Sequence, residues 1–262
     1  VGFKLGPALA SGCSIIIKPS ALSPLSAYIL GKIIHDIDFP AGVVNILSGP
    51  TREVATTLSK SKIPSVLTMI GSTATGQRVI ADSVTSIKKL SMELGGNAPF
   101  IVFEDADIDK ALNLAVGIKF GNSGQICVAA NRFFVHKSLY NSFLEKYVER
   151  VNNLKLGFGI NQKPDMGPMV TRNDRDRMFD LINDATEKGG VLLAGGEIPQ
   201  GMEDGNWMMP TVISEMTTEM RLFREETFGP IAPFMSFETD EEVLRLANDT
   251  EFGLASYIFT NN

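Results

Sequence analysis

Short apolar segments alternate with helical patterns along the first third of the chain, and this alternation constrains the fold more than any other feature. Strand-like apolar runs occupy residues 14–18, 43–46, 66–70 and 88–94. Patterns with helical spacing lie between them, at residues 25–37, 51–59 and 71–81. Strands separated by helices of about ten residues predict a parallel, doubly wound α/β sheet. Continuous apolar strands also indicate burial on both faces of that sheet.

A second α/β region follows the glycine pair Gly95-Gly96, which interrupts the pattern. Its strand-like segments are residues 100–103, 132–135, 209–213, 234–237 and 256–259, and its helical patterns are residues 108–116, 140–148 and 174–188. We expect Asp105 and Ser138 to cap the first two of these helices, because short polar side chains satisfy free N–H groups there. We therefore predict two domains, residues 1–94 and 95–262.

Composition excludes several classes of protein. The chain has 262 residues, of which 44% are hydrophobic and 21% charged, as in a globular protein with a core. Its net charge of −6, without a basic block, argues against a nucleic-acid partner. No apolar run is long enough for a membrane span. Only two cysteines, Cys13 and Cys127, are present, which fits a reducing cytoplasm and no disulfide scaffold. The spacing of His and Cys residues predicts no metal site.

One thiol and one carboxylate stand beside glycines. Residues 124–132 read GQICVAANR, so Cys127 follows a glycine-containing turn, and residues 92–97 read MELGGN, with Glu93 before the glycine pair. A deprotonated thiol attacks carbonyl carbons, and a half-buried carboxylate can take a proton or hold a water. From these residues alone, a small core residue is the better interpretation of Cys127, and a solvent-facing strand residue is the better interpretation of Glu93.

Three segments together resemble the aldehyde dehydrogenase superfamily: MELGGN, GQICVAANR and, at residues 225–230, EETFGP. Residues 94–103 (LGGNAPFIVF) and 248–255 (NDTEFGLA) are most similar to its succinate-semialdehyde dehydrogenase branch. The resemblance implies an α/β fold in which part of a Rossmann-like NAD(P)-binding domain is followed by an α/β catalytic domain. It also implies a homo-oligomer, dimer or tetramer, and a chain that lacks the family's N-terminal third and C-terminal tail.

By this resemblance, Cys127 attacks the carbonyl carbon of a small aldehyde, hydride passes to the nicotinamide, and a thioester remains. The backbone N–H of Cys127 is then one donor to the oxyanion. Glu93 is the implied general base that activates water, and it favours hydrolysis to the free acid, since relatives that acylate coenzyme A generally lack this glutamate. Two alternatives stay open: a coenzyme A-acylating semialdehyde dehydrogenase, and a dinucleotide-binding fragment without activity.

The cofactor residues are expected mainly in the first domain. Residues 71–76 read GSTATG between a strand and a helix, where free N–H groups can hold a phosphate, although many β–α turns have this composition. Lys18 ends a strand; such lysines are usually solvated, but the resemblance implies a contact with the adenosine ribose. The full set of implied cofactor contacts is Lys18, Ser20, Ala21, Gly71, Ser72, Gly76, Leu94, Glu226 and Phe228.

The choice of cofactor and substrate depends on departures from the family pattern. NAD-preferring relatives often have a glutamate where this chain has Ala21, and that carboxylate would repel a 2′-phosphate. We therefore expect NADP, with NAD as the alternative. Succinate-semialdehyde enzymes commonly bind the distal carboxylate through arginines, where this chain has Phe3 and Gly121. The sequence thus leaves a less polar aldehyde open as the substrate.

Overall fold

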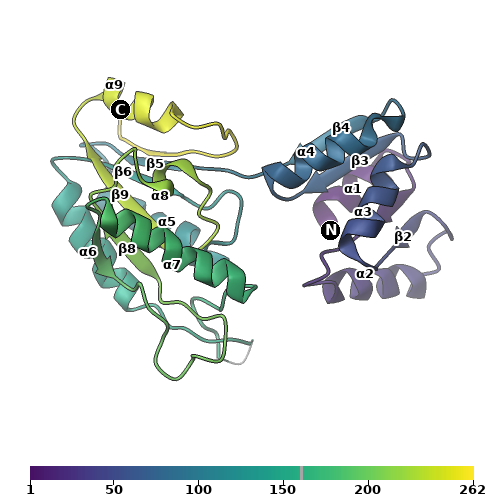
Figure 1. Cartoon of the computed structure of the whole chain (residues 1–262), viewed down its shortest axis with the longest axis horizontal. Helices are drawn as coiled ribbons and strands as arrows, with labels where there is room; N and C mark the ends of the chain where they lie inside the picture. The colour runs from purple at the N-terminus through teal and green to yellow at the C-terminus, as the bar shows by residue number, and fades with distance from the viewer. Residues whose placement is uncertain (160–161) are drawn as a thin grey trace. The chain divides into compact units, whose positions relative to one another are not determined.

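The computed structural model describes residues 1–159 and 162–262. These residues form two compact units, residues 1–94 and 95–262 (Figure 1). The first unit contains α1 (Gly2–Ala10), β1 (Ile15–Ile17), α2 (Leu25–Asp36), β2 (Val44–Ile46), α3 (Thr51–Lys60), β3 (Val66–Ile70), α4 (Thr73–Asp82), the 3₁₀ turn η1 (Ser83–Thr85) and β4 (Lys89–Glu93). The alternation predicted from the sequence is confirmed element by element in this unit.

The strands of the first unit pair in parallel, as expected, but they form two ladders and not one sheet. β1 pairs with β2, and β3 pairs with β4 in the register Ile70↔Glu93. The expected burial on both faces is wrong here. The side chains of Ile16, Val66 and Ile70 are each about half exposed, at 48%, 56% and 58%. Each apolar run therefore forms a strand, as predicted. Whether the faces of that strand are buried depends on other segments of the chain.

Helix α2 illustrates the same point. Leu25, Ile29 and Ile33 repeat every four residues and so share one face of the helix. All three side chains are exposed. The buried apolar residues of this unit are Leu5 and Ala27. The unit therefore has local secondary structure but a small apolar core.

The second unit is built around one sheet. Its strands are β5 (Pro99–Val102), β6 (Arg132–His136), β7 (Val191–Ala194), β8 (Thr211–Ser214), β9 (Ile231–Phe237) and β10 (Tyr257–Phe259). Its helices are α5 (Ile108–Phe120), the 3₁₀ segment η2 (Gly121–Gly124), α6 (Tyr140–Asn152), α7 (Arg172–Glu187), α8 (Arg221–Arg224) and α9 (Asp240–Asn248). The strand order is β10-β5-β6-β9-β8-β7, and all neighbours are parallel except the edge pair β7–β8.

Both faces of this sheet are buried. Phe133 belongs to an apolar cluster with residues of α5 and α6, while the next residue, Phe134, belongs to a cluster with residues of α7, α8 and α9. Because side chains alternate across a strand, these two clusters are the two faces of the sheet. Figure 1 shows α7 lying in front of the strands. The α/β arrangement expected for residues 95–262 is confirmed.

The two expected helix caps are wrong. α5 begins after Asp107, whose side chain accepts the N–H of Lys110, and Asp105 instead accepts hydrogen bonds from Thr260 and Asn261. α6 has no side-chain cap, because the Ser138 hydroxyl bonds to His136. In both places a neighbouring element competes for the polar side chain. The sequence analysis also missed β7, α8 and α9, of which α8 is a single turn.

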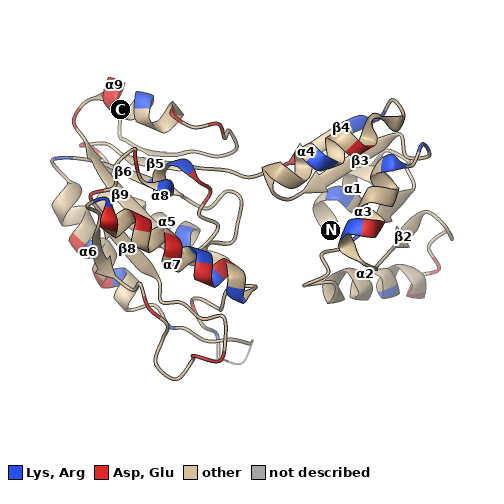
Figure 2. Cartoon of the chain, viewed as in Figure 1, with Lys and Arg blue, Asp and Glu red and all other residues tan. Residues whose placement is uncertain are grey.

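Figure 2 shows acidic and basic residues interspersed along α7, as its sequence RNDRDRMFDLINDATE requires. Among the helices of the described residues, none combines the length and the hydropathy that a membrane crossing needs.

Candidate active site

Cys127 lies in a tight turn of the second unit. The N–H of Ala129 donates to the carbonyl of Ile126 over 2.9 Å, which makes Cys127 and Val128 the two central residues of a β-turn. The Cys127 side chain is half-buried and forms no disulfide. A thiol at the corner of a turn is accessible to a small molecule, and its backbone N–H lies outside any helix or strand ladder. This geometry suits a nucleophile better than a core residue.

The segment before this turn has an unusual backbone. Asn122, Ser123 and Gly124 all have left-handed φ angles, of 51°, 58° and 72°. Such a conformation is costly for residues with a side chain and needs support from the surroundings. Ser123 provides part of it, since its hydroxyl donates to the carbonyl of Gly167 over 2.7 Å. Gln125 provides more, because its side-chain oxygen accepts the N–H of Val170 over 2.9 Å.

The glycine pair brings two of the predicted residues close together. A Cβ atom on Gly96 would lie 2.5 Å from the carbonyl oxygen of Cys127, so only glycine fits there. The N–H of Gly96 donates to the carboxylate of Glu226 over 3.0 Å. The structure therefore places Glu226 beside the backbone that contacts Cys127. Burial raises the pKa of Glu226, and the Gly96 hydrogen bond and the charge of Arg177 oppose that rise.

Asn131 connects these segments. Its amide group donates to the side chain of Asn97 and to the carbonyl of Glu225, and its oxygen accepts the N–H of Thr227 over 3.0 Å. It thus joins the end of the cysteine segment to the glycine pair and to residues 225–227. The sequence analysis gave Asn131 no role at the site, because its partners lie far away along the chain.

Two arginines that the sequence analysis did not assign to the site also hold this region. The fully buried guanidinium of Arg132 donates to the carbonyls of Asn97, Leu246 and Ala247. Arg177, on α7, donates to the carbonyls of Glu226 and Thr227. Arg177 and Asn131 therefore both hold the backbone of residues 225–227. Phe228 follows with a left-handed φ of 48°, and its ring is 41% exposed.

In the first unit, three predicted cofactor residues line one hollow. This hollow, of about 210 Å³, is bordered by Lys18, Pro19, Ser20, Ala21, Pro24, Tyr28, Ser48 and Gly49. The Lys18 amine donates to the carbonyl of Pro19 and supplies positive charge at the hollow. Gly49 and Ser48 come from the end of the neighbouring strand, β2, and no feature of their own sequence indicated a site.

The turn at residues 71–76 joins β3 to α4. Ser72 caps α4, accepting the N–H of Thr75 over 3.3 Å, and Gly71 donates its N–H to the carbonyl of Glu93 over 3.0 Å. Gly76 is buried beneath Leu94, whose side chain would lie 2.6 Å from a Cβ at this position. The first turn of α4 is exposed. N–H groups at the start of a helix have no partner within the helix, so they can bind a phosphate.

Glu93 ends β4 and has a partner that the sequence analysis did not predict. The Lys4 amine on α1 lies 3.7 Å from its carboxylate, whose side chain is 38% exposed. The pair is partly solvated, so its attraction is modest. A carboxylate that ends a strand and remains accessible can still take up a proton from a water molecule.

The two positions that differ from the semialdehyde pattern are both open. The Phe3 side chain is 77% exposed. A Cβ atom on Gly121 would meet nothing within 4 Å. Neither position is occupied by a charged group.

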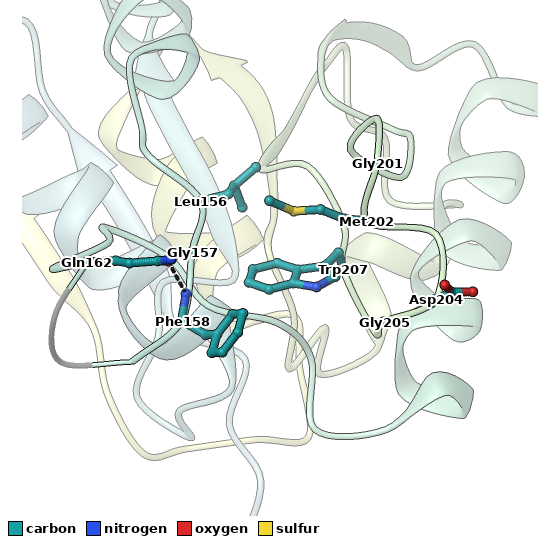
Figure 3. Close-up of a pocket in the computed structure, with 9 residues that line it drawn as sticks. All are labelled: Leu156, Gly157, Phe158, Gln162, Gly201, Met202, Asp204, Gly205 and Trp207. Atoms are coloured by element: carbon teal, nitrogen blue, oxygen red, sulfur yellow. Dashed lines mark hydrogen bonds between the residues drawn. The ribbon is translucent and has the colours of Figure 1, made fainter.

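A second hollow lies in the second unit, and none of the predicted site residues lines it. It measures about 470 Å³ and is lined by Leu156, Gly157, Phe158, Gln162, Gly201, Met202, Asp204, Gly205 and Trp207 (Figure 3). Phe158 and Trp207 face one another across it, with ring centroids 6.2 Å apart. Within the part of the chain that the structure describes, no group of three or more His, Cys, Asp or Glu residues is arranged to hold a metal ion.

Comparison with known proteins identifies the family. The model of the aldehyde dehydrogenase family matches residues 1–262. The mitochondrial succinate-semialdehyde dehydrogenase of Oryza sativa subsp. japonica is 42% identical over 260 residues, which are 99% of this chain and 49% of that protein. The 3-sulfolactaldehyde dehydrogenase of Pseudomonas putida is 42% identical over 259 residues, 99% of this chain and 53% of that protein.

A solved structure gives the same answer. The crystal structure of an NADP-dependent enzyme from E. coli superimposes with a TM-score of 0.96 at 39% identity, covering 99% of this chain and 53% of that one. The chain therefore belongs to the aldehyde dehydrogenase family, and the expected fold and the resemblance are confirmed. It spans about half the length of the relatives that it matches.

Proposed function

We propose that the protein oxidises an aldehyde to the carboxylic acid with NAD(P), and that Cys127 is the nucleophile. The observation that carries the proposal is the turn at Ile126–Ala129, in which a half-buried thiol follows three residues of left-handed backbone. Strained backbone concentrates at functional sites, where it fixes a reactive group in place. Family membership supports the same chemistry.

Each step of the reaction has a residue of this chain. The Cys127 thiolate forms a bond to the aldehyde carbon, and the carbonyl oxygen becomes an oxyanion that the Cys127 N–H can stabilise. A nicotinamide cofactor, when bound, would accept the hydride that this adduct loses from the former aldehyde carbon, which leaves a thioester on Cys127. Glu93 takes a proton from water, the water attacks the thioester, and the carboxylic acid leaves with the thiol restored. We propose Glu93 for this role because it is accessible.

We propose residues 1–94 as the principal cofactor-binding region. Lys18, Ser20 and Ala21 share one hollow, and the exposed start of α4 offers N–H groups to a pyrophosphate. The hollow has one cation and no carboxylate, which favours NADP over NAD. Glu226 and Phe228 are the proposed contacts to the nicotinamide end, in the catalytic region of residues 95–262.

We propose that the substrate is a small aldehyde. Succinate semialdehyde is one candidate among the small aldehydes. Relatives of nearly equal identity are named for succinate semialdehyde and for 3-sulfolactaldehyde, both of which carry an anionic group. The absence of charge at Phe3 and Gly121 favours a less polar aldehyde. These two lines of support disagree, so a substrate panel must include both kinds.

The experiment is reduction of NAD and NADP by the full-length protein with anionic and neutral aldehydes, with and without coenzyme A. The expected result is reduced cofactor and free acid without coenzyme A. A thioester product that needs coenzyme A would establish the acylating alternative. Cofactor binding without any turnover would establish the non-catalytic alternative and overturn the proposal.

Assembly and location complete the proposal. We propose a homo-oligomer in the cytoplasm, consistent with two unpaired cysteines and the family. Light scattering of the purified protein measures the assembly, and a monomeric mass at micromolar concentration would contradict it. Fractionation of cells measures the location.

A further inference from the structure

The edge strand β10 contributes a hydrogen bond to the turn that carries Cys127. The hydroxyl of Tyr257, the first residue of β10, donates to the carbonyl of Val128 over 2.7 Å. Val128 is the residue after Cys127 and the third residue of the turn. The side chain of Tyr257 thus contacts the backbone at the corner that presents the thiol.

The Tyr257 ring has a fixed position of its own. Tyr257 pairs with Phe100 in the parallel register of β10 and β5, and the two rings lie 5.9 Å apart. Phe100 is completely buried and packs on Phe133 in the centre of the sheet. The core therefore fixes the position of the Tyr257 hydroxyl, and the hydroxyl restrains the Ile126–Ala129 turn.

Tyr257 also lies close enough to Cys127 for their charges to interact. The pKa of the Tyr257 phenol is raised first by burial and then by the negative charge of the Cys127 thiolate. The phenol consequently stays protonated and remains a donor to Val128 at neutral pH. Together with the contact between Gly96 and the Cys127 carbonyl, this bond restrains the turn from two directions.

We propose that Tyr257 is a positioning residue for Cys127. Its hydroxyl keeps the Ile126–Ala129 turn in one conformation, so that the thiol and the Cys127 N–H are presented together. This inference rests on the proposed function for its catalytic consequence. The effect of the Tyr257 hydroxyl on the reactivity of Cys127 can be measured without turnover.

The test is Tyr257→Phe, which keeps the ring and its packing and removes only the O–H group. In a Cys13→Ser background Cys127 is the single thiol of residues 1–262, and its alkylation by iodoacetamide at pH 7.5 is followed by mass spectrometry of the peptide that contains it. We expect a rate at least threefold below that of the parent, because a mobile turn presents the thiol less often. The matched control is Tyr147→Phe, since the buried Tyr147 hydroxyl has no hydrogen-bond partner among the described residues.

The outcomes separate the inference from the proposed function. In the full-length protein, Tyr257→Phe should lower kcat about tenfold and leave KM for aldehyde and cofactor within twofold. Circular dichroism shows whether both variants are folded. An alkylation rate equal to or above the parent rate would overturn the positioning role. A parent that is readily alkylated but oxidises no aldehyde would refute the proposed function alone.

Discussion

The two units of this chain use similar sequence patterns and reach different degrees of burial. In residues 95–262 an apolar cluster covers each face of the sheet, and Phe133, Phe134 and Phe234 have no exposed surface. In residues 1–94 the strand residues Ile16, Val66 and Ile70 are about half exposed. Both regions alternate strands with helices. The comparison shows that periodicity specifies the elements, and that cover from other segments decides which faces become a core.

The difference extends to the candidate site. In the second unit, the Tyr257 hydroxyl bonds to the cysteine turn, and Asn131 and Arg177 hold the backbone at Thr227, all through long-range contacts. In the first unit, the proposed cofactor residues depend on local structure: a strand end at Lys18 and a helix start at Ser72. We infer that the nucleophile belongs to the region with extensive tertiary support, and that most of the cofactor contacts belong to the region with local support.

The sharpest way to break this comparison is Cys127→Ala. We expect aldehyde oxidation by the full-length protein to fall by at least ~10³-fold, because the substitution removes the nucleophile that forms the thioester. Cofactor affinity, which we assign to residues 1–94, should stay within twofold by calorimetric titration. The control Cys13→Ala removes an exposed thiol and should leave the rate unchanged. Turnover within tenfold of the parent would contradict the assignment of chemistry to the second unit.

Glu93→Gln tests whether the first unit contributes only binding. Attack on the aldehyde should proceed while water activation fails, so turnover should fall about 10²-fold and an acyl adduct should accumulate on Cys127. Mass spectrometry after mixing with aldehyde and cofactor detects the adduct. Glu53→Gln, on the exposed first turn of α3, is the control. Fast hydrolysis without an adduct would show that the base is another residue.

Ala21→Glu tests whether the hollow around Lys18 determines the preference between NADP and NAD. The parent should bind NADP at least as well as NAD. A glutamate here would place like charges together near the 2′-phosphate, at a cost sufficient for about a hundredfold change in relative affinity. Calorimetric titration of both cofactors measures it, with Ala41→Glu, outside the hollow, as the control. A strong NAD preference in the parent that the substitution leaves unchanged would exclude Ala21 as the determinant.

Lys119→Met tests whether the core of the second unit excludes water from a buried amine. The Lys119 amine, at the end of α5, is completely buried without a hydrogen-bond partner among the described residues, and burial lowers its pKa from 10.5 to about 7. Since the unfolded chain binds this proton up to pH 10.5, the free energy of unfolding should rise with pH between about 7 and 10.5. Below pH 7 both states are protonated, and the buried charge destabilises the fold.

The variant should remove that pH dependence and stabilise the protein by about 2 kcal/mol at pH 6, roughly thirtyfold in the folding equilibrium. Urea denaturation at pH 6, 8 and 10 measures both effects. Lys146→Met, at an exposed position of α6, is the matched control. A steeper or unchanged slope in Lys119→Met would show that the amine has access to water.

Local patterns were enough for most of the fold. Residues 66–70 and 73–82 form the strand and helix that their apolar spacing predicts, because the two periods follow from backbone geometry alone. The helix caps were predicted less well. Asp105 was expected to cap α5, yet it binds Thr260 and Asn261, which lie more than 150 residues away. The hydrogen-bond partner of a polar side chain can come from a distant segment, which the local sequence does not reveal.

At the site, the sequence by itself determined which groups can do chemistry: the thiol of Cys127, the carboxylate of Glu93 and the uncharged Ala21 beside Lys18 are matters of residue type and local order. Only the tertiary structure decided how the thiol is presented. The left-handed backbone at Asn122 and Ser123 and the hydroxyl of Tyr257 on Val128 depend on segments far apart in the chain. Such contacts appear only when a strained backbone is held by a packed core, because no short segment can stabilise that conformation alone.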